Sequence, residues 1–136
     1  MGPVRRSPLL ATMRILLCED QDAIRRMIEA LVGASGHEVI GVGTGREAVE
    51  RALTEPFDVL LLDLMLPGSM DGFEVCARLR AHPTTSGLPI IVISALDDHE
   101  ARARALQLGA TAYYAKPFRP LELLEHIGGL KPARRA

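Results

Sequence analysis

Four short runs of mainly apolar residues, each followed by a polar side chain, are the feature that most constrains the fold of this chain. A continuous apolar run of this length, bounded by turn residues, is typical of a strand buried on both faces of a sheet. Each run delivers its polar residue at the same end, so we expect four strands whose polar groups meet at one edge. The runs are Ile15–Cys18, Val59–Leu62, Ile90–Ile93 and Ala112–Ala115, and they are followed by Glu19–Asp20, Asp63, Ser94 and Lys116.

Helical patterns separate these strands. After the first strand, apolar residues recur at the spacing of one helical face, with Asp22 expected to cap the start and Gly36 to end the helix. A short strand is predicted over Glu38–Val42. The apolar residues that define the face of the first helix are Ile24, Met27, Ile28, Leu31 and Val32. Further helices are predicted around Ala48–Leu53, from near Asp71 to before Pro83, from about Asp98 to Leu108, and over Leu121–Ile127.

Strand and helix therefore alternate five times. Such alternation predicts an α/β fold with a parallel sheet covered by helices on both faces. We expect the flavodoxin-like, doubly wound order 2-1-3-4-5, with five strands and five helices. In that order strands one and three are neighbours. Because the strand order reverses between them, a crevice opens at their carboxyl ends. Glu19, Asp20 and Asp63 are expected to meet in this crevice.

Length and composition are those of one small globular domain. The chain has 136 residues, a net charge of -1 and 48% hydrophobic residues, and the absence of a basic stripe argues against nucleic-acid binding. No apolar stretch is long enough to span a bilayer, and the start does not resemble a signal peptide. Cys18 and Cys76 are expected to be reduced core residues of a cytoplasmic protein. We expect residues 1–12 to be a flexible tail, 13–130 the domain, and 131–136 a tail or the start of a linker.

Three carboxylates gathered in one crevice repel each other, so positive charge has to compensate them. Mg²⁺ suits such a place because it takes oxygen ligands from carboxylates, waters and phosphates. Lys116 offers a second positive charge, in a chain whose basic residues are nearly all arginine. Transfer of a phosphoryl group requires mainly positioning and charge neutralisation. The residues therefore favour a site at which Asp63 accepts a phosphoryl group, with the Ser94 hydroxyl donating to one of its oxygens.

At this point the span from Arg14 to about Leu130 resembles the receiver domain of two-component response regulators. Each of the matching segments is weak alone, but together, in this order and spacing, they are specific. The segments are Leu17-Cys18-Glu19-Asp20, Leu62-Asp63-Leu64-Met65-Leu66-Pro67, Asp71-Gly72, Ile93-Ser94-Ala95, and Gly109-Ala110 followed by Tyr113 and Lys116-Pro117-Phe118.

The resemblance implies a phosphoacceptor site built on Asp63, which takes a phosphoryl group from a sensor histidine kinase or a histidine phosphotransfer protein. Asp20 and Asp63 would bind Mg²⁺, with help from Glu19 and from the backbone carbonyl of Met65. Ser94 and Lys116 would contact the phosphoryl group, and the bond between Lys116 and Pro117 is usually cis in the family.

The resemblance also implies a switch. Ser94 would move toward the phosphoryl group, and Tyr113 would turn inward behind it. The face made by the fourth helix, fifth strand and fifth helix would then bind a downstream protein. Such a domain is a signalling phosphoacceptor rather than an enzyme with a separate substrate, and is expected as a monomer or weak dimer without nucleic-acid or membrane partners.

The sequence departs from the family pattern at the acidic pair, which is Glu19-Asp20 where many members have two aspartates, and in the loop after Asp63. The glycine that commonly follows the phosphoacceptor by eight residues is here Gly72, nine residues on, which indicates one extra residue in Pro67–Gly72. The extra residue could alter access or kinase pairing, although an inert bulge is the simpler interpretation. Met65 and Leu96 occupy the variable flanking positions, and neither side chain can orient water. We therefore expect slow autodephosphorylation.

Three other classes of protein compete with this interpretation. A flavin-binding domain of the same topology would need a Gly- and Ser/Thr-rich loop after the first strand, where acidic residues here would repel a phosphate. A phosphatase with an aspartyl nucleophile would need a general acid at the position of Met65. A receiver-like module that binds partners without phosphorylation stays open, because of the extra residue between Pro67 and Gly72.

Overall fold

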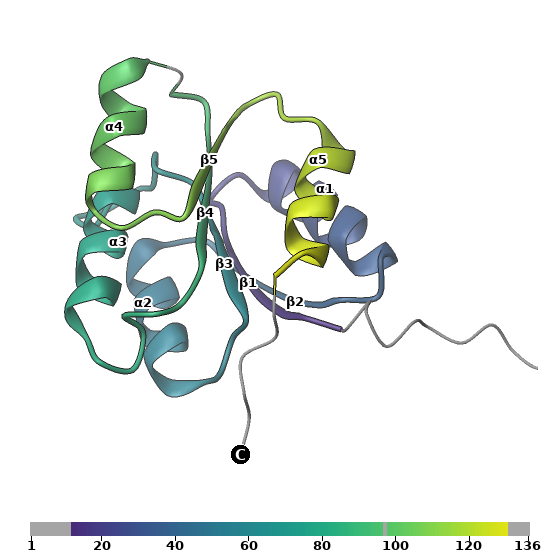
Figure 1. The fold of residues 1–136 in the computed structure, drawn as a ribbon, viewed down its shortest axis with the longest axis horizontal. Coiled ribbons are helices and arrows are strands. Elements are labelled where there is room, and N and C mark those ends of the chain that lie inside the picture. The colour runs from purple at the N-terminus through teal and green to yellow at the C-terminus, as the bar shows by residue number, and fades with distance from the viewer. Residues whose placement is uncertain (1–11, 97, 131–136) are drawn as a thin grey trace, which may run out of the picture.

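The computed structural model describes residues 12–96 and 98–130, which form a five-stranded parallel sheet between two layers of helices (Figure 1). The sheet has the order β2-β1-β3-β4-β5, so the predicted flavodoxin-like fold is confirmed. The strands are β1 (Arg14–Cys18), β2 (Glu38–Val42), β3 (Val59–Leu62), β4 (Ile90–Ser94) and β5 (Ala112–Ala115). The helices are α1 (Asp22–Ala34), α2 (Gly45–Thr54), α3 (Gly72–Ala81), α4 (His99–Gln107) and α5 (Pro120–Gly128).

The central strands are buried because both of their faces are covered. In Figure 1, α2, α3 and α4 cover one face of the sheet, while α1 and α5 cover the other. Side chains alternate along each strand, so Leu16 and Leu60 join the core under α2–α4, whereas Leu17 and Leu61 join the core under α1 and α5. The register pairs Leu16 with Leu60 and Leu17 with Leu61. Both faces of β1 and β3 are thus apolar, as their uninterrupted sequences predict.

Three helices start at a side chain that accepts a hydrogen bond from the backbone. Thr44, Asp71 and Asp98 cap α2, α3 and α4 in this way. The prediction that Asp22 caps α1 is wrong. The N-cap of α1 is Gln21, which makes no side-chain cap, and Asp22 is the first helical residue.

The predicted apolar face of α1 is only partly buried. Ile28 and Val32 are buried in the core, but Met27 is 54% exposed. Gly36 does follow the helix in the left-handed conformation, with φ of 93°, as expected of a residue that ends a helix.

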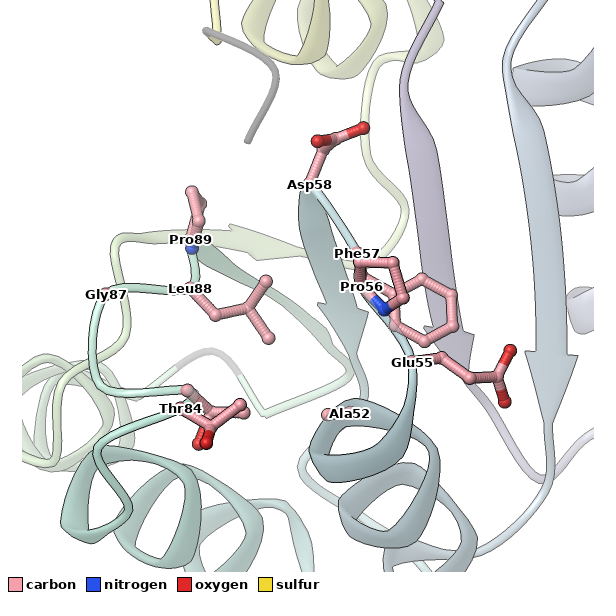
Figure 2. A pocket seen from close by; sticks show the side chains of 10 residues that line it. Ala52, Glu55, Pro56, Phe57, Asp58, Thr84, Gly87, Leu88 and Pro89 are labelled. Carbon is pink, nitrogen blue, oxygen red and sulfur yellow. The ribbon is translucent and has the colours of Figure 1, made fainter. Parts of the chain in front are cut away.

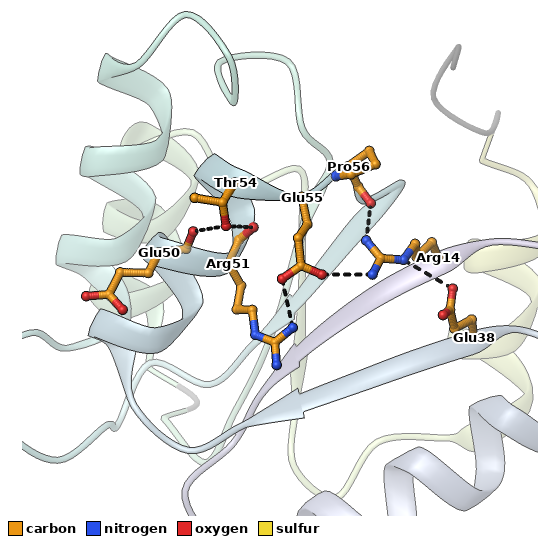
Figure 3. A network of polar contacts seen from close by, with 7 residues as sticks. All are labelled: Arg14, Glu38, Glu50, Arg51, Thr54, Glu55 and Pro56. Carbon is orange, nitrogen blue, oxygen red and sulfur yellow. Dashed lines mark hydrogen bonds and ion pairs between the residues drawn. The ribbon is translucent and has the colours of Figure 1, made fainter. Parts of the chain in front are cut away.

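A polar network closes the amino end of the sheet (Figure 3). The Arg14 guanidinium donates to Glu38 Oε2 at 3.1 Å, to Glu55 Oε1 at 2.9 Å and to the Pro56 carbonyl at 2.7 Å. Arg51 donates to the other oxygen of Glu55 at 2.7 Å. The hydrogen bond from Arg14 is the main cause that lowers the pKa of Glu55. The network ties β1 to β2 and to the segment between α2 and β3.

A pocket of about 400 Å³ lies at the same amino end, between the segment that precedes β3 and the segment that precedes β4. Figure 2 shows Leu88 reaching into the space between the two segments, while the Asp58 carboxylate points away from it. Asp58 Oδ2 instead accepts a hydrogen bond from the Arg14 backbone N–H at 2.6 Å. The pocket is therefore separate from the edge at which the predicted site residues lie.

In the part of the chain that the structure describes, no helix combines the length and the apolar character needed to cross a membrane. The tails predicted over residues 1–12 and 131–136 lie outside the described residues, apart from Thr12.

Arg80 and Arg78 on α3 provide a matched test of what holds the fold together. Arg80 donates two hydrogen bonds to the Gly109 carbonyl, at 3.0 and 2.8 Å, and one to the Thr85 carbonyl at 3.1 Å. We expect Arg80→Met to lower the free energy of unfolding by about 2 kcal/mol, because charge-assisted hydrogen bonds to two connections are lost. Arg78 pairs with Glu74 at the surface, so Arg78→Met should cost less than about 0.5 kcal/mol.

Urea unfolding of the two variants and the wild type measures both values. Equal destabilisation by the two substitutions would contradict the assignment of Arg80 as a link between α3 and its two neighbouring connections.

Candidate functional site

The candidate site lies at the carboxyl edge of the sheet, where β1 and β3 end side by side. The Asp63 N–H donates to the Cys18 carbonyl at 3.0 Å, which extends the β1–β3 ladder by one residue. On the other side of β1, the Glu19 N–H donates to the Val42 carbonyl at 3.0 Å. Parallel pairing with both neighbours therefore brings Glu19 and Asp63 next to each other, as the crevice in this strand order predicts.

Three carboxylates gather at this edge. One oxygen from each of Glu19, Asp20 and Asp63 lies within 4.8 Å of the others. Glu19 and Asp63 are only 1% and 6% exposed, whereas Asp20 is exposed to solvent. The predicted meeting of these residues is thus found, with two carboxylates buried and the third at the surface.

Lys116, which follows β5, supplies the cation between the two buried carboxylates. Its Nζ lies 2.5 Å from Glu19 Oε1 and 3.2 Å from Asp63 Oδ2. Burial by itself lowers the pKa of Lys116, but the hydrogen bond to Glu19 and the charge of Asp63 outweigh it and raise the pKa above its ordinary value. The ammonium is therefore charged at neutral pH, and its contribution to folding is lost only as the pH rises above the ordinary lysine value.

Backbone N–H groups fix the remaining oxygens of the two buried carboxylates. Met65 N donates to Asp63 Oδ1 at 3.1 Å, and Gln21 N donates to Glu19 Oε2 at 3.1 Å. Each carboxylate is thus held by a backbone N–H on one oxygen and by Lys116 on the other. This arrangement satisfies charges that would otherwise be costly to bury.

Ser94, one of the two predicted switch residues, lies at the end of β4, the strand next to β3. Ser94 is fully buried, and its Oγ accepts a hydrogen bond from Leu96 N at 3.2 Å. The Lys116 N–H donates to the Ser94 carbonyl at 2.8 Å, so the backbones of the two residues are directly linked.

The Tyr113 side chain lies in an inward position. The residue is 8% exposed, its hydroxyl donates to the Leu96 carbonyl, and the Arg102 guanidinium lies 4.8 Å from its ring centre. Ser94 and Tyr113 therefore contact the two backbone polar groups of the same residue, Leu96.

The donor set fits a hard divalent cation such as Mg²⁺. Carboxylate oxygens are the protein ligands that Mg²⁺ prefers, and here Glu19, Asp20 and Asp63 offer them at one solvent-reached point. The Met65 carbonyl, expected as a further ligand, stays a prediction. The peptide bond between Lys116 and Pro117 is cis, as the sequence resemblance led us to expect.

The loop with the extra residue packs closely against its surroundings at its carboxyl end, at Met70 and Gly72. A Cβ on Gly72 would lie 2.4 Å from the Asp63 carbonyl oxygen, and one on Gly45 would lie 2.6 Å from the Met70 carbonyl oxygen, so only glycine allows these approaches. Gly68, earlier in the loop, has φ of 84°, with open space where a Cβ would lie. Gly68 and Ser69 are exposed. The extra length is thus accommodated at the surface, which favours the interpretation of an inert bulge.

The two cysteines are buried and free, as predicted. Burial is the main cause that raises the pKa of Cys18 to about 12, and the neighbouring charge of Asp63 adds to it. Burial also raises the pKa of Cys76 to about 11. Both thiols are therefore protonated at neutral pH and act as small core side chains rather than nucleophiles.

Comparison with known proteins gives the same class as the fold and the site. The family model of the response regulator receiver domain matches residues 15–128. This chain therefore belongs to the response regulator receiver family, whose members are signalling proteins of two-component systems.

Curated relatives include longer regulators. The chain is 38% identical over 117 residues to response regulator PleD of Caulobacter vibrioides, covering 86% of this chain and 26% of that protein. It is 40% identical over 114 residues to the probable transcriptional regulator ycf27 of Porphyridium aerugineum, covering 84% of this chain and 46% of that protein. The chain thus spans between a quarter and a half of the length of these relatives.

Solved structures of similar proteins share the fold. A putative response regulator from Chloroflexus aurantiacus superimposes with a TM-score of 0.81 at 35% identity, covering 86% of this chain and 95% of that one. The chemotaxis protein CheY4 of Vibrio cholerae gives 0.81 at 30%, covering 89% and 100%. The receiver domain of a sensor histidine kinase from Pseudomonas aeruginosa gives 0.78 at 35%, covering 87% and 95%, and is described with a magnesium ion coordinated in its active site cleft.

One residue beside the site was missed from the sequence. Arg25 on α1 donates from Nη1 to the Glu19 carbonyl at 2.8 Å. A signal was present in Gly41, which lies in β2 shortly before Gly43, because glycine is depleted in strands unless another group approaches the backbone closely. Both glycines face the Arg25 side chain.

The close approach of Gly72 to the Asp63 segment can be tested with a matched pair of glycines. We expect Gly72→Ala to lower the free energy of unfolding by about 1–3 kcal/mol, because its Cβ would overlap backbone atoms of Asp63 and Leu64. Gly33 lies in α1 with open space around it among the described residues, so Gly33→Ala should stabilise the protein by up to about 1 kcal/mol.

Thermal or urea unfolding of both variants distinguishes the two effects. If Gly72→Ala were as stable as the wild type, the contact between the start of α3 and the Asp63 segment would not constrain the site.

Proposed function

We propose that this chain is a phosphoacceptor receiver domain in which Asp63 takes a phosphoryl group from a histidine of a sensor kinase or phosphotransfer protein. The observation that carries the proposal is the shared contact of Lys116 with Asp63 Oδ2 and Glu19 Oε1 beside the exposed Asp20. A buried carboxylate next to a fixed cation and a hard-cation donor set is the equipment that phosphoryl transfer to an aspartate needs.

In this proposal an oxygen of Asp63 attacks the phosphorus of the donor. The P–N bond to the donor imidazole breaks, its electron pair stays on nitrogen, and a P–O bond to Asp63 forms. Lys116 is positioned to balance the negative charge that the phosphoryl oxygens bring, while Met65 N–H keeps the other Asp63 oxygen oriented. Asp20, Asp63, Glu19 and the Met65 carbonyl would hold Mg²⁺, which supplies further neutralisation of the phosphoryl oxygens.

The same site would operate the switch. A phosphoryl group offers oxygens that the Ser94 hydroxyl can donate to, in place of its present contact with Leu96 N. Because Tyr113 donates to the Leu96 carbonyl, a shift of the Ser94–Leu96 segment reaches Tyr113 directly. The populations of inward and outward Tyr113 would then differ between the two states, and a downstream protein would read them on the face of α4, β5 and α5.

The receiver domain comprises residues 13–130, acts in the cytoplasm without nucleic-acid or membrane partners, and is a monomer or weak dimer. It catalyses its own phosphorylation and slow dephosphorylation, and has no separate substrate to turn over.

The assignment of Asp63 is tested by intact mass after incubation with Mg²⁺ and acetyl phosphate. We expect one phosphoryl adduct on the wild type and none on Asp63→Ala, because the nucleophilic oxygen is removed. Asp71→Asn is the matched control, since an asparagine still caps α3 and the residue lies outside the carboxylate cluster. It should keep the adduct.

An adduct on Asp63→Ala would show that another residue is the acceptor. If the wild type took no phosphoryl group from either acetyl phosphate or a phosphorylated histidine donor, the alternative of a receiver-like binding module that works without phosphorylation would replace the proposal.

The expected slow dephosphorylation is tested at Met65, which is 54% exposed and whose N–H already contacts Asp63. We expect Met65→Asn to speed the loss of the phosphoryl group by about tenfold, a fraction of the ~10²–10⁴ that a positioned proton-transfer group contributes. The added amide could orient the attacking water, which a thioether cannot. Met27→Asn is a control of equal exposure on α1 and should leave the rate unchanged.

The rate is followed by the decay of the phosphorylated mass after the donor has been removed. Rapid decay in the wild type that Met65→Asn leaves unaltered would refute the account.

A further inference from the structure

Arg25 on α1 reaches the backbone of the carboxylate cluster. Its Nη1 donates to the Glu19 carbonyl at 2.8 Å, and its Nη2 lies 2.5 Å from Asp22 Oδ1. The side chain is 21% exposed, which is low for an arginine on an outer helix. The guanidinium therefore joins the start of α1 to the residue that precedes Asp20.

Two glycines, Gly41 in β2 and Gly43 shortly after it, leave the space in which the Arg25 side chain lies. A Cβ on Gly41 would lie 3.0 Å from Arg25 Cδ and 3.0 Å from Glu29 Oε1, and one on Gly43 would lie 3.7 Å from Arg25 Nη1. Glu29 in turn lies 3.8 Å from Arg25 Nε. The absence of a side chain at Gly41 thus lets the Arg25 stem lie flat against the sheet, with its charged end aimed at Glu19.

We propose that Arg25 is a positioning residue for the metal-binding carboxylates, an inference that rests on the proposed Mg²⁺ site. The Glu19 carbonyl and the Asp20 N–H belong to one planar peptide unit, so a hydrogen bond to that carbonyl fixes the plane from which Asp20 departs. Val42 holds the N–H of Glu19, while Gln21 and Lys116 hold its carboxylate. Arg25 completes this set by holding the carbonyl.

An arginine serves this purpose because of its shape. The planar guanidinium donates in two fixed directions at once, here to a carbonyl and to a carboxylate. A lysine offers a similar charge but a single donor centre at the end of a flexible stem. Arg25→Lys therefore keeps the positive charge near the carboxylate cluster but removes the two fixed directions in which the guanidinium donates hydrogen bonds.

This difference separates positioning from simple electrostatics. If Arg25 acted only through its charge, it would repel Mg²⁺. Arg25→Met would then strengthen Mg²⁺ binding, and Arg25→Lys would leave Mg²⁺ binding unchanged. As a positioning residue, both substitutions weaken binding, because Asp20 is no longer held in its orientation.

Calorimetric titration with Mg²⁺ alone tests the proposal on the full chain. We expect Arg25→Lys to raise the Kd for Mg²⁺ about tenfold, the effect typical of losing a residue that orients metal ligands. The exposed neighbour Arg26 gives the matched control, and Arg26→Lys should bind as the wild type does. Gly41→Ala keeps Arg25 but places a methyl group in the space that the Arg25 side chain occupies, so it should also raise the Kd for Mg²⁺. Wild-type Kd values for both Arg25→Lys and Gly41→Ala would overturn the proposal.

A second measurement needs no metal and so separates this inference from the proposed function. Amide hydrogen exchange at Asp20 and Gln21 should be about tenfold faster in Arg25→Lys than in the wild type, and unchanged in Arg26→Lys, if the peptide plane is held by Arg25. If the wild type takes up no Mg²⁺, the proposed metal site fails, and the exchange result alone decides whether Arg25 orders this turn. Unchanged exchange in Arg25→Lys would overturn the positioning role.

Discussion

The contact of the Lys116 ammonium with Glu19 and Asp63 is the interaction on which the rest of the site depends. Two nearly buried carboxylates side by side would each lose several kcal/mol of hydration, and their like charges add to that cost. One cation shared between them, with a backbone N–H on each remaining oxygen, makes the arrangement sustainable. A phosphoryl group on Asp63 would change the balance of charge among Asp63, Glu19 and Lys116, and the neighbouring segments would shift in response.

The sheet order delivers these groups to one place. Glu19 follows β1, Asp63 follows β3 and Lys116 follows β5, so residues from distant parts of the chain meet because parallel strands end at the same edge. The Ser94 carbonyl accepts from the Lys116 N–H, which connects the lysine to the end of β4 and so to Leu96, whose carbonyl accepts from the Tyr113 hydroxyl of β5. The core strands thus act as a frame that holds these polar groups at one edge of the sheet.

Much of this was predictable from the sequence because strand burial and strand ends leave local patterns. The uninterrupted apolar run Val59–Leu62 predicted a doubly covered strand, and its polar neighbour predicted the site. Asp22 was wrongly predicted as a cap because residue propensity does not tell which residue of a polar turn is the N-cap and which is the first residue of the helix. In the structure Asp22 is the first helical residue, and its carboxylate pairs with Arg25. Arg25 itself was missed because its partner is a backbone carbonyl, so no complementary side chain marks the contact, and the glycine at position 41 was the remaining signal.

The two edges of the sheet show why one set of ionic groups is structural and the other suits chemistry. In the network at the amino end, Arg14 and Arg51 face Glu38 and Glu55, so each of these two guanidinium groups and two carboxylates is paired (Figure 3). At the carboxyl end, three carboxylates cluster around Lys116, which contacts two of them. The excess negative charge at that edge favours a further cation, and a cation held there would in turn favour an incoming phosphoryl group. Imbalance of charge, at a point that the fold makes rigid, is what distinguishes the candidate site from the network at the opposite end.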